Sequence, residues 1–203
     1  MNKLDKNKIL KMLSIFSNQK ASGFTLVELT VSIFIITLIT AVAVVNIRDY
    51  KKTGNLSMTA QNLASFIRLA ENYALNLKEF SPTATFPAGG WGVYISSSST
   101  PQRIILFSDR DSSRDYNALP FPDEKVQDFI IPAGIAISDV RIGSNSRNTA
   151  NIIFIPPDPK IFICSNGAAC SSNSEANTIS ITLVSENISK SISANIFGLV
   201  EVN

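Results

Sequence analysis

A run of 22 residues, Phe24 to Val45, carries a single ionisable side chain, that of Glu28. At about 1.5 Å per residue, a helix of this length crosses the roughly 30 Å of a bilayer hydrocarbon core. The length and apolarity of the run therefore predict a membrane-spanning helix rather than a buried core helix. Because an Asp-like charge costs ~2.5–3.5 kcal/mol at the centre of such a helix, we expect Glu28 to have a partner.

The residues before this run are basic and small. Residues 1–23 hold five lysines and one aspartate, although the whole chain has a net charge of only +2. A basic flank stays on the cytoplasmic side, which predicts a single-pass inner-membrane protein with a cytoplasmic N-terminus and an extracytoplasmic remainder. The small residues Ala21, Ser22 and Gly23 precede the apolar run, whereas in an ordinary secretory signal they follow it.

Composition also narrows the chemistry. The chain has no histidine, which removes histidine-based acid–base catalysis and histidine-containing metal sites. No phosphate-binding loop, nucleophile elbow or zinc motif is present, so we expect no enzyme. The two cysteines, Cys164 and Cys170, are expected to form a disulfide outside the cytoplasm, with free thiols as the alternative.

An amphipathic helix is expected to continue the apolar run. Apolar residues follow spacings of three and four, and the first proline is Pro82. The spacing predicts one helix from Thr25 to Leu77, with Gly54 as the point where it bends or melts. The apolar positions of its second half are Leu56, Ala60, Leu63, Phe66, Ile67, Ala70, Tyr73, Ala74 and Leu77.

The rest of the chain is rich in β-formers separated by turn residues. Strands are expected at residues 90–95, 103–109, 128–132, 135–142, 151–155, 160–165, 178–185 and 192–202. In one of them Ile179, Ile181 and Leu183 alternate with more polar residues, which predicts one buried face. The expected fold is α+β: a helix at residues 24–78, spanning the membrane at about 24–47, and an antiparallel β-sheet head at 79–203.

Residues 23–28, Gly-Phe-Thr-Leu-Val-Glu, resemble the N-terminal cleavage and methylation motif of type IV pilins and type II secretion pseudopilins. The resemblance implies a pilin-like fold, removal of residues 1–23 by a prepilin peptidase after Gly23, and N-methylation of Phe24. It further implies partners in other subunits and in an inner-membrane assembly platform. In this family the glutamate, here Glu28, is thought to pair with the N-terminal amine of a neighbouring subunit.

Glu28 lies one helical turn from Phe24, so its carboxylate and the new amine share a face. In an apolar filament core, pairing of this carboxylate with the amine of a neighbouring subunit selects the register of the two subunits more than it adds stability. A snorkelling or protonated carboxylate without a partner is the alternative. An uncleaved signal-anchored envelope protein with a ligand-binding β head is the alternative function, and it gives Glu28 no role.

The resemblance that bears on the subtype of subunit is weaker than that of the cleavage motif. Residues 68–78, 89–95 and 196–202 resemble the minor pseudopilins typified by GspH and FimT, although Gly90-Trp91-Gly92 is equally explained by a tight turn into a strand. Many major pilins have a proline near the end of the apolar half-helix, where this chain has Val44-Val45-Asn46. The missing proline and a long, irregular head favour a minor subunit.

Two weaker patterns concern ligands of the head. Asp109, Asp111, Ser113 and Asp115 alternate as at the start of a calcium loop, with Asn117 nearby. Arg114 stands where that loop needs glycine and Pro120 where it needs glutamate, so a solvated turn is the favoured interpretation. DNA binding needs a basic stripe, and the arginines of the head are scattered among acids.

Overall fold

The computed structural model describes residues 23–80, 85–116, 124–157, 160–165 and 174–203. The expected leader up to Ser22, as well as Asn117, Pro120 and Cys170, therefore lie outside the described residues. The chain divides into two compact units, Met1–Arg48 and Asp49–Asn203.

Helix α2 runs from Leu26 to Leu75 and contributes its first part to one unit and its second part to the other. The helix begins at Leu26 because the Thr25 hydroxyl accepts a hydrogen bond from the Glu28 N–H at 3.2 Å, as an N-cap does. It ends where Leu77 adopts a left-handed conformation, with φ of 47°. There Leu77 N–H donates to the Ala74 carbonyl at 3.1 Å and Lys78 N–H to the Tyr73 carbonyl at 2.9 Å, which is a Schellman motif.

The predicted helix is therefore confirmed to within two residues at its C-terminal end, with two corrections. Leu77 follows the helix and is 55% exposed, so its assignment to the buried stripe was wrong. Gly54 is helical, so the helix does not melt there, because a lone glycine lowers helix stability without removing a backbone hydrogen bond; a bend at Gly54 stays a prediction.

We expect Gly54→Ala to stabilise the protein. A Cβ at Gly54 meets no atom within 4 Å, so the substitution adds no clash while it removes the backbone entropy of glycine. The gain expected from helix propensity is ~0.5–1 kcal/mol, measured as a higher urea midpoint of the full chain in detergent micelles. A lower midpoint would show that a non-helical conformation at Gly54 matters.

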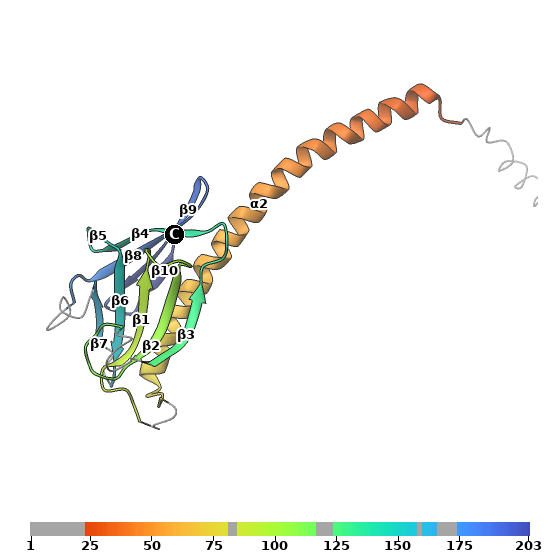
Figure 1. Cartoon of the computed structure of the whole chain (residues 1–203). Coiled ribbons are helices and arrows are strands. Elements are labelled where there is room, and N and C mark those ends of the chain that lie inside the picture. The colour runs from red at the N-terminus through yellow and green to blue at the C-terminus, as the bar shows by residue number, and fades with distance from the viewer. Residues whose placement is uncertain (1–22, 81–84, 117–123, 158–159, 166–173) are drawn as a thin grey trace, which may run out of the picture. The chain divides into compact units, whose positions relative to one another are not determined.

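The second unit contains two antiparallel five-stranded sheets, where one antiparallel sheet was expected (Figure 1). The first has the order β3-β2-β1-β6-β7 and the second the order β10-β9-β8-β4-β5. The strands of the first sheet are β1 (Gly90–Ser96), β2 (Arg103–Asp109), β3 (Glu124–Ile130), β6 (Thr149–Ile155) and β7 (Lys160–Cys164). Those of the second are β4 (Ala136–Ile142), β5 (Asn145–Arg147), β8 (Thr178–Ser185), β9 (Ile188–Asn195) and β10 (Val200–Val202).

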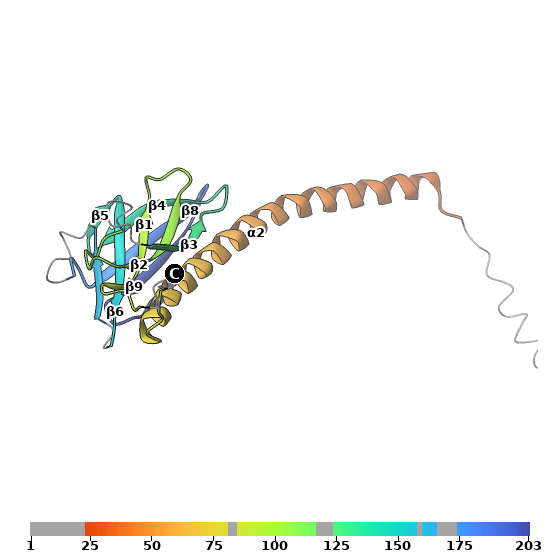
Figure 2. The same ribbon diagram turned by 60° about the horizontal axis from the view of Figure 1, so that its bottom comes forward.

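One hydrophobic core joins both sheets and the second part of α2, which lies along them (Figure 2). The helix contributes Leu56, Leu63 and Ile67, all fully buried. Alternation in β8 is confirmed, with Ile179, Ile181 and Leu183 buried. A smaller apolar cluster around Phe107 and Ile153 covers the other face of the first sheet.

The strand predictions were wrong in three places. Strand β3 starts four residues before the expected segment 128–132 and ends before Pro132, which has no N–H for a ladder. The expected strand 192–202 is two strands, because a turn at residues 196–199 with Gly198 at φ of 84° separates β9 from β10. Strand β5 was missed because its residues, Asn-Ser-Arg, are all exposed and carry no apolar pattern.

Candidate functional site

The apolar part of α2 packs against no other described part of the chain. Residues Leu26–Val44 form a 19-residue stretch with mean hydropathy 2.4 and no buried residue, long and apolar enough to cross a membrane. All large hydrophobic side chains from Phe24 to Val44 are exposed, Phe24 by 76% and Leu26 by 79%. A surface of this size is stable only when lipid or other apolar helices cover it.

The hydroxyl groups of this segment are satisfied within the helix. Thr30, Ser32, Thr37 and Thr40 each donate to a backbone carbonyl three or four residues earlier, at 2.7–2.8 Å. Such back-bonding removes the cost of placing a hydroxyl in hydrocarbon. Glu28 differs from these residues, because its carboxylate has no ion pair among the described residues.

The junction before the helix is non-helical and accessible. Gly23, Phe24 and Thr25 lie outside the helix and are exposed, and a Cβ at Gly23 meets no atom within 4 Å. The Gly23–Phe24 peptide bond thus lies two residues before the first helical residue, Leu26. A peptidase needs a non-helical, exposed bond, because a helical backbone has its amides already hydrogen-bonded.

Glu28 sits in the first turn of α2, the position that favours a negative charge near the positive end of the helix dipole. Sequence reasoning missed the role of Thr25 as N-cap. The signal was present, since Thr-x-x-Glu before an apolar run is the pattern of a capping box. The predicted cleavage point, methylation residue and glutamate therefore cluster within six consecutive residues around one helix start.

The predicted calcium residues are used in local structure. The buried Asp109 carboxylate accepts hydrogen bonds from Ser113 N–H at 3.2 Å and Arg114 N–H at 3.0 Å. Asp115 accepts from the Asn151 side chain at 2.8 Å. Within the described residues no three carboxylates or cysteines gather as a metal site, and calcium binding stays an untested prediction.

The loop that follows Asp109 stabilises the ionised form of the Asp111 carboxyl. Partial burial raises the pKa of its carboxyl, but hydrogen bonds from Ser113 outweigh that effect and hold the pKa below its usual value. Ser113 N–H donates to the Asp111 carboxylate at 2.9 Å. The loop is thus held closed by its own backbone amides.

The other predicted residues are separate from the junction. Cys164 is fully buried on β7 and is disulfide-bonded; its expected partner Cys170 lies outside the described residues, so the pairing of the two stays a prediction. For DNA, three arginines of the head, Arg103, Arg141 and Arg147, pair with carboxylates. Arg114 lies over the Phe162 ring, 3.9 Å from its centroid, and DNA binding stays untested.

Comparison with known proteins gives one match. Residues 18–44 match the family model of the prokaryotic N-terminal methylation motif, which covers Gly23, Phe24 and Glu28. No curated protein and no solved structure matches the chain. The match ends at Val44, the last residue of the exposed apolar stretch.

Proposed function

Because the chain carries at residues 18–44 the prepilin signature of type IV pilins and pseudopilins, we propose that it is a structural subunit of a type IV pilus or a type II secretion pseudopilus. The observation that carries this proposal is the exposed apolar helix whose single ionisable residue, Glu28, lies one turn after a non-helical, exposed junction. In this proposal the chain does no chemistry of its own. It is the substrate of a prepilin peptidase.

Cleavage after Gly23 makes the amine of Phe24 the new N-terminus, which the peptidase then methylates. Before cleavage the chain offers no positive charge between Phe24 and Val45 to meet the Glu28 carboxylate. After cleavage each subunit carries one carboxylate and one amine at the same end of its helix. When two subunits are in register, the carboxylate of one can neutralise the amine of the other. A subunit out of register leaves an unpaired charge in an apolar environment.

The membrane holds the subunit until assembly. The proposed anchor is the Leu26–Val44 stretch, with the N-terminus in the cytoplasm and the head outside. Neighbouring subunits delivered by an inner-membrane platform then replace lipid around this helix. An uncleaved signal-anchored protein with a ligand-binding head is the competing proposal, and it requires neither cleavage nor Glu28.

The subunit class is the finer part of the proposal. The reasons for a minor subunit are the long, irregular head and the missing proline at residues 44–46. The copy number of this chain relative to the other subunits of a purified filament tests that expectation.

We expect the mature protein, recovered from its host's membranes, to begin at Phe24 with one extra methyl group. The measurement is the mass of the N-terminal peptide. Gly23→Leu is the matched variant, because a bulky side chain at the cut obstructs an extended peptide in a protease cleft, and its chain should keep the leader. A terminus at Met1, or a cut beyond Val45, would contradict the proposal.

A further inference from the structure

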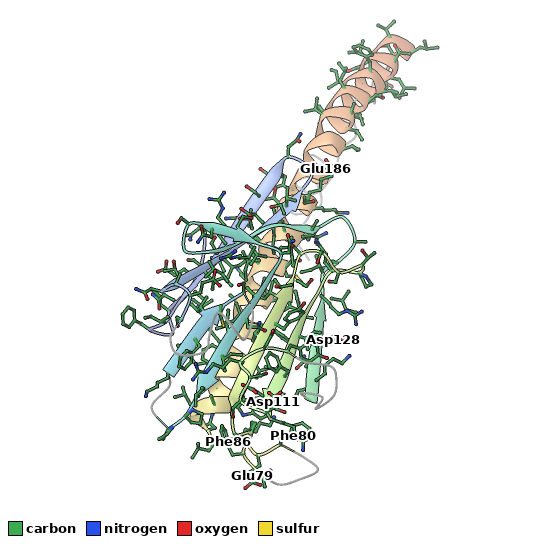
Figure 3. All side chains as sticks on the ribbon, turned by 60° about the vertical axis from the view of Figure 1, so that its left-hand side comes forward. Glu79, Phe80, Phe86, Asp111, Asp128 and Glu186 are labelled. Carbon is green, nitrogen blue, oxygen red and sulfur yellow. The ribbon has the colours of Figure 1, made fainter. Side chains whose placement is uncertain are left out.

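The two edge strands of the first sheet, β3 and β7, are protected in different ways. An edge strand presents outward N–H and C=O groups to which a strand of another chain can add, and bulges and charged side chains are common protection against this. Strand β3 has both. Its pairing with β2 shifts register between Leu106 and Phe107. Lys125 Nζ lies 2.9 Å from the carboxylate of Asp128, which Figure 3 shows on this strand.

Strand β7 is more regular and more apolar than β3. Its sequence is Lys-Ile-Phe-Ile-Cys, with a single charge at the first residue. Its pairing with β6 runs without a register shift from Lys160 opposite Ile155 to Cys164 opposite Asn151. A regular apolar edge of this kind is the type to which a further strand adds most readily. The protection of β7 must therefore come from another part of the chain.

Ser174 and Glu175 lie along this edge, and we call these two residues the edge cap. In an antiparallel edge strand alternate residues point their N–H and C=O groups outward, and in β7 these include Ile161 and Ile163. Ile163 N–H donates to the Ser174 hydroxyl oxygen at 3.3 Å, and that hydroxyl donates to the Ile161 carbonyl at 3.2 Å. Glu175 N–H donates to the Ile163 carbonyl at 2.8 Å. The edge cap thus occupies groups that a further strand would need.

The Glu175 carboxylate continues the edge cap past the end of β7. Ser165 N–H donates to this carboxylate at 2.8 Å. Arg147 donates to it through Nε at 2.9 Å from β5, the edge strand of the second sheet, which lies on the same side of the head as β7 (Figure 1). Partial burial raises the pKa of the Glu175 carboxyl, but hydrogen bonds from Ser165 and Arg147 outweigh that effect and hold the pKa below its usual value. An ionised side chain therefore helps to hold the edge cap in place.

We propose that the edge cap is an autoinhibitory contact, which prevents the head from adding a strand of another chain at β7. Its two residues take hydrogen bonds that a sixth strand would make, although they are not themselves a strand. Without them, the same outward groups are available to an extended segment, as in proteins that bind partners by strand addition. The inference goes beyond the proposed function, because it concerns the head alone and uses neither Glu28 nor the cleavage point.

The test removes both side chains of the edge cap from the full-length chain in detergent micelles. Ser174→Ala combined with Glu175→Ala deletes the hydroxyl and the carboxylate that accept from Ile163 N–H and Ser165 N–H. The first measurement is hydrogen–deuterium exchange of dilute protein, in which these two amides should exchange roughly tenfold faster than in the wild type. The Phe162 amide should keep its rate, because it points toward β6.

Strand addition is measured on the same amides at high protein concentration, where the chain itself is the probe. In the double variant the Ile163 amide should regain its protection as other copies add to the open edge, and the sedimenting mass should rise. Ser189→Ala combined with Glu201→Ala is the matched control, because both residues are exposed, on β9 and β10. The wild type and the control should show neither change.

Each failure has a distinct meaning. Unchanged exchange at Ile163 would show that these side chains do not close the edge. Faster exchange without renewed protection at high concentration would show that the open edge adds no strand. Equal association of the control would place that association elsewhere on the chain. Any of these results overturns the inference.

A milder variant covers the case in which the double variant unfolds. The fluorescence of the buried Trp91 reports whether the head is folded. Glu175→Gln keeps the size of the side chain and the backbone N–H, and it weakens only the bonds of the carboxylate to Ser165 and Arg147. It should change exchange and association in the same direction by a smaller factor, and wild-type behaviour of folded Glu175→Gln would contradict the role of the carboxylate.

Discussion

Glu28→Leu is expected to insert into the membrane normally and to lose assembly. Leucine removes the one charge between Phe24 and Val45, so insertion becomes easier by about 3 kcal/mol or less. In a filament the same change leaves the Phe24 amine of the neighbouring subunit in an apolar environment without its partner. Removing one member of a buried pair costs ~3–5 kcal/mol, which corresponds to a loss of roughly a hundredfold or more in incorporation.

The measurement compares the amount of this chain in membranes and in the sheared filament fraction. Thr37→Val is the matched control, because Thr37 lies in the same segment and its hydroxyl is already bonded to the Ile33 carbonyl at 2.8 Å. That variant should assemble at the wild-type level. Normal incorporation of Glu28→Leu would contradict the role proposed for this carboxylate. Absence of the wild-type chain from the filament fraction would favour the uncleaved signal-anchored protein, for which Glu28 has no function.

The helix and its start could be predicted closely from the sequence because both are set by local interactions. Unbroken apolarity, then a spacing of three and four, predicted α2, and Thr25 with Glu28 supplies the cap where the helix begins. The end of the helix was placed two residues late. Leu77 is apolar and in phase with the stripe, but it takes the left-handed position of a Schellman motif, which usually belongs to glycine.

The β head was predictable as a set of strands and not as two sheets. Strand β1 pairs with β2, its neighbour in sequence, and also with β6, more than fifty residues away. Such a long-range pairing depends on which apolar faces meet in the core, and no local pattern records it. The same limit applies to the junction residues, because their place could be predicted from the sequence, whereas the partner proposed for Glu28 lies on another molecule.

The turn between β9 and β10, residues 196–199, illustrates a different limit of prediction from sequence. Residues 192–202 are apolar enough to predict one strand, and only the conformation of Gly198, with φ of 84°, divides it. Within that turn an apolar residue looks in sequence like a core residue. The exposure of Phe197 follows from the hydrogen bonds to Asn195, which hold the ring outside the sheet.

Gly90→Ala is expected to destabilise the head more than any other single methyl group considered for it. Gly90 has φ of 93°, and a Cβ there would lie 2.2 Å from the carbonyl oxygen of Phe154 on β6. Backbone strain and the clash each contribute about 1–3 kcal/mol, together a large part of the 5–15 kcal/mol that stabilises a typical domain. The buried Trp91, the only tryptophan of the chain, reports unfolding in urea by its fluorescence.

Gly134→Ala separates the two causes. Gly134 has a similar φ of 85°, yet a Cβ there meets no atom within 4 Å, so only the strain of about 1–3 kcal/mol applies. We expect the urea midpoint of Gly90→Ala to fall well below that of Gly134→Ala. Equal midpoints would mean that β1 and β6 move apart to admit the methyl group, and that Gly90 serves only the turn before Trp91. A large difference would instead show that Gly90 is required by the close approach of β1 to β6, which explains the Gly-Trp pair without any reference to a pseudopilin subtype.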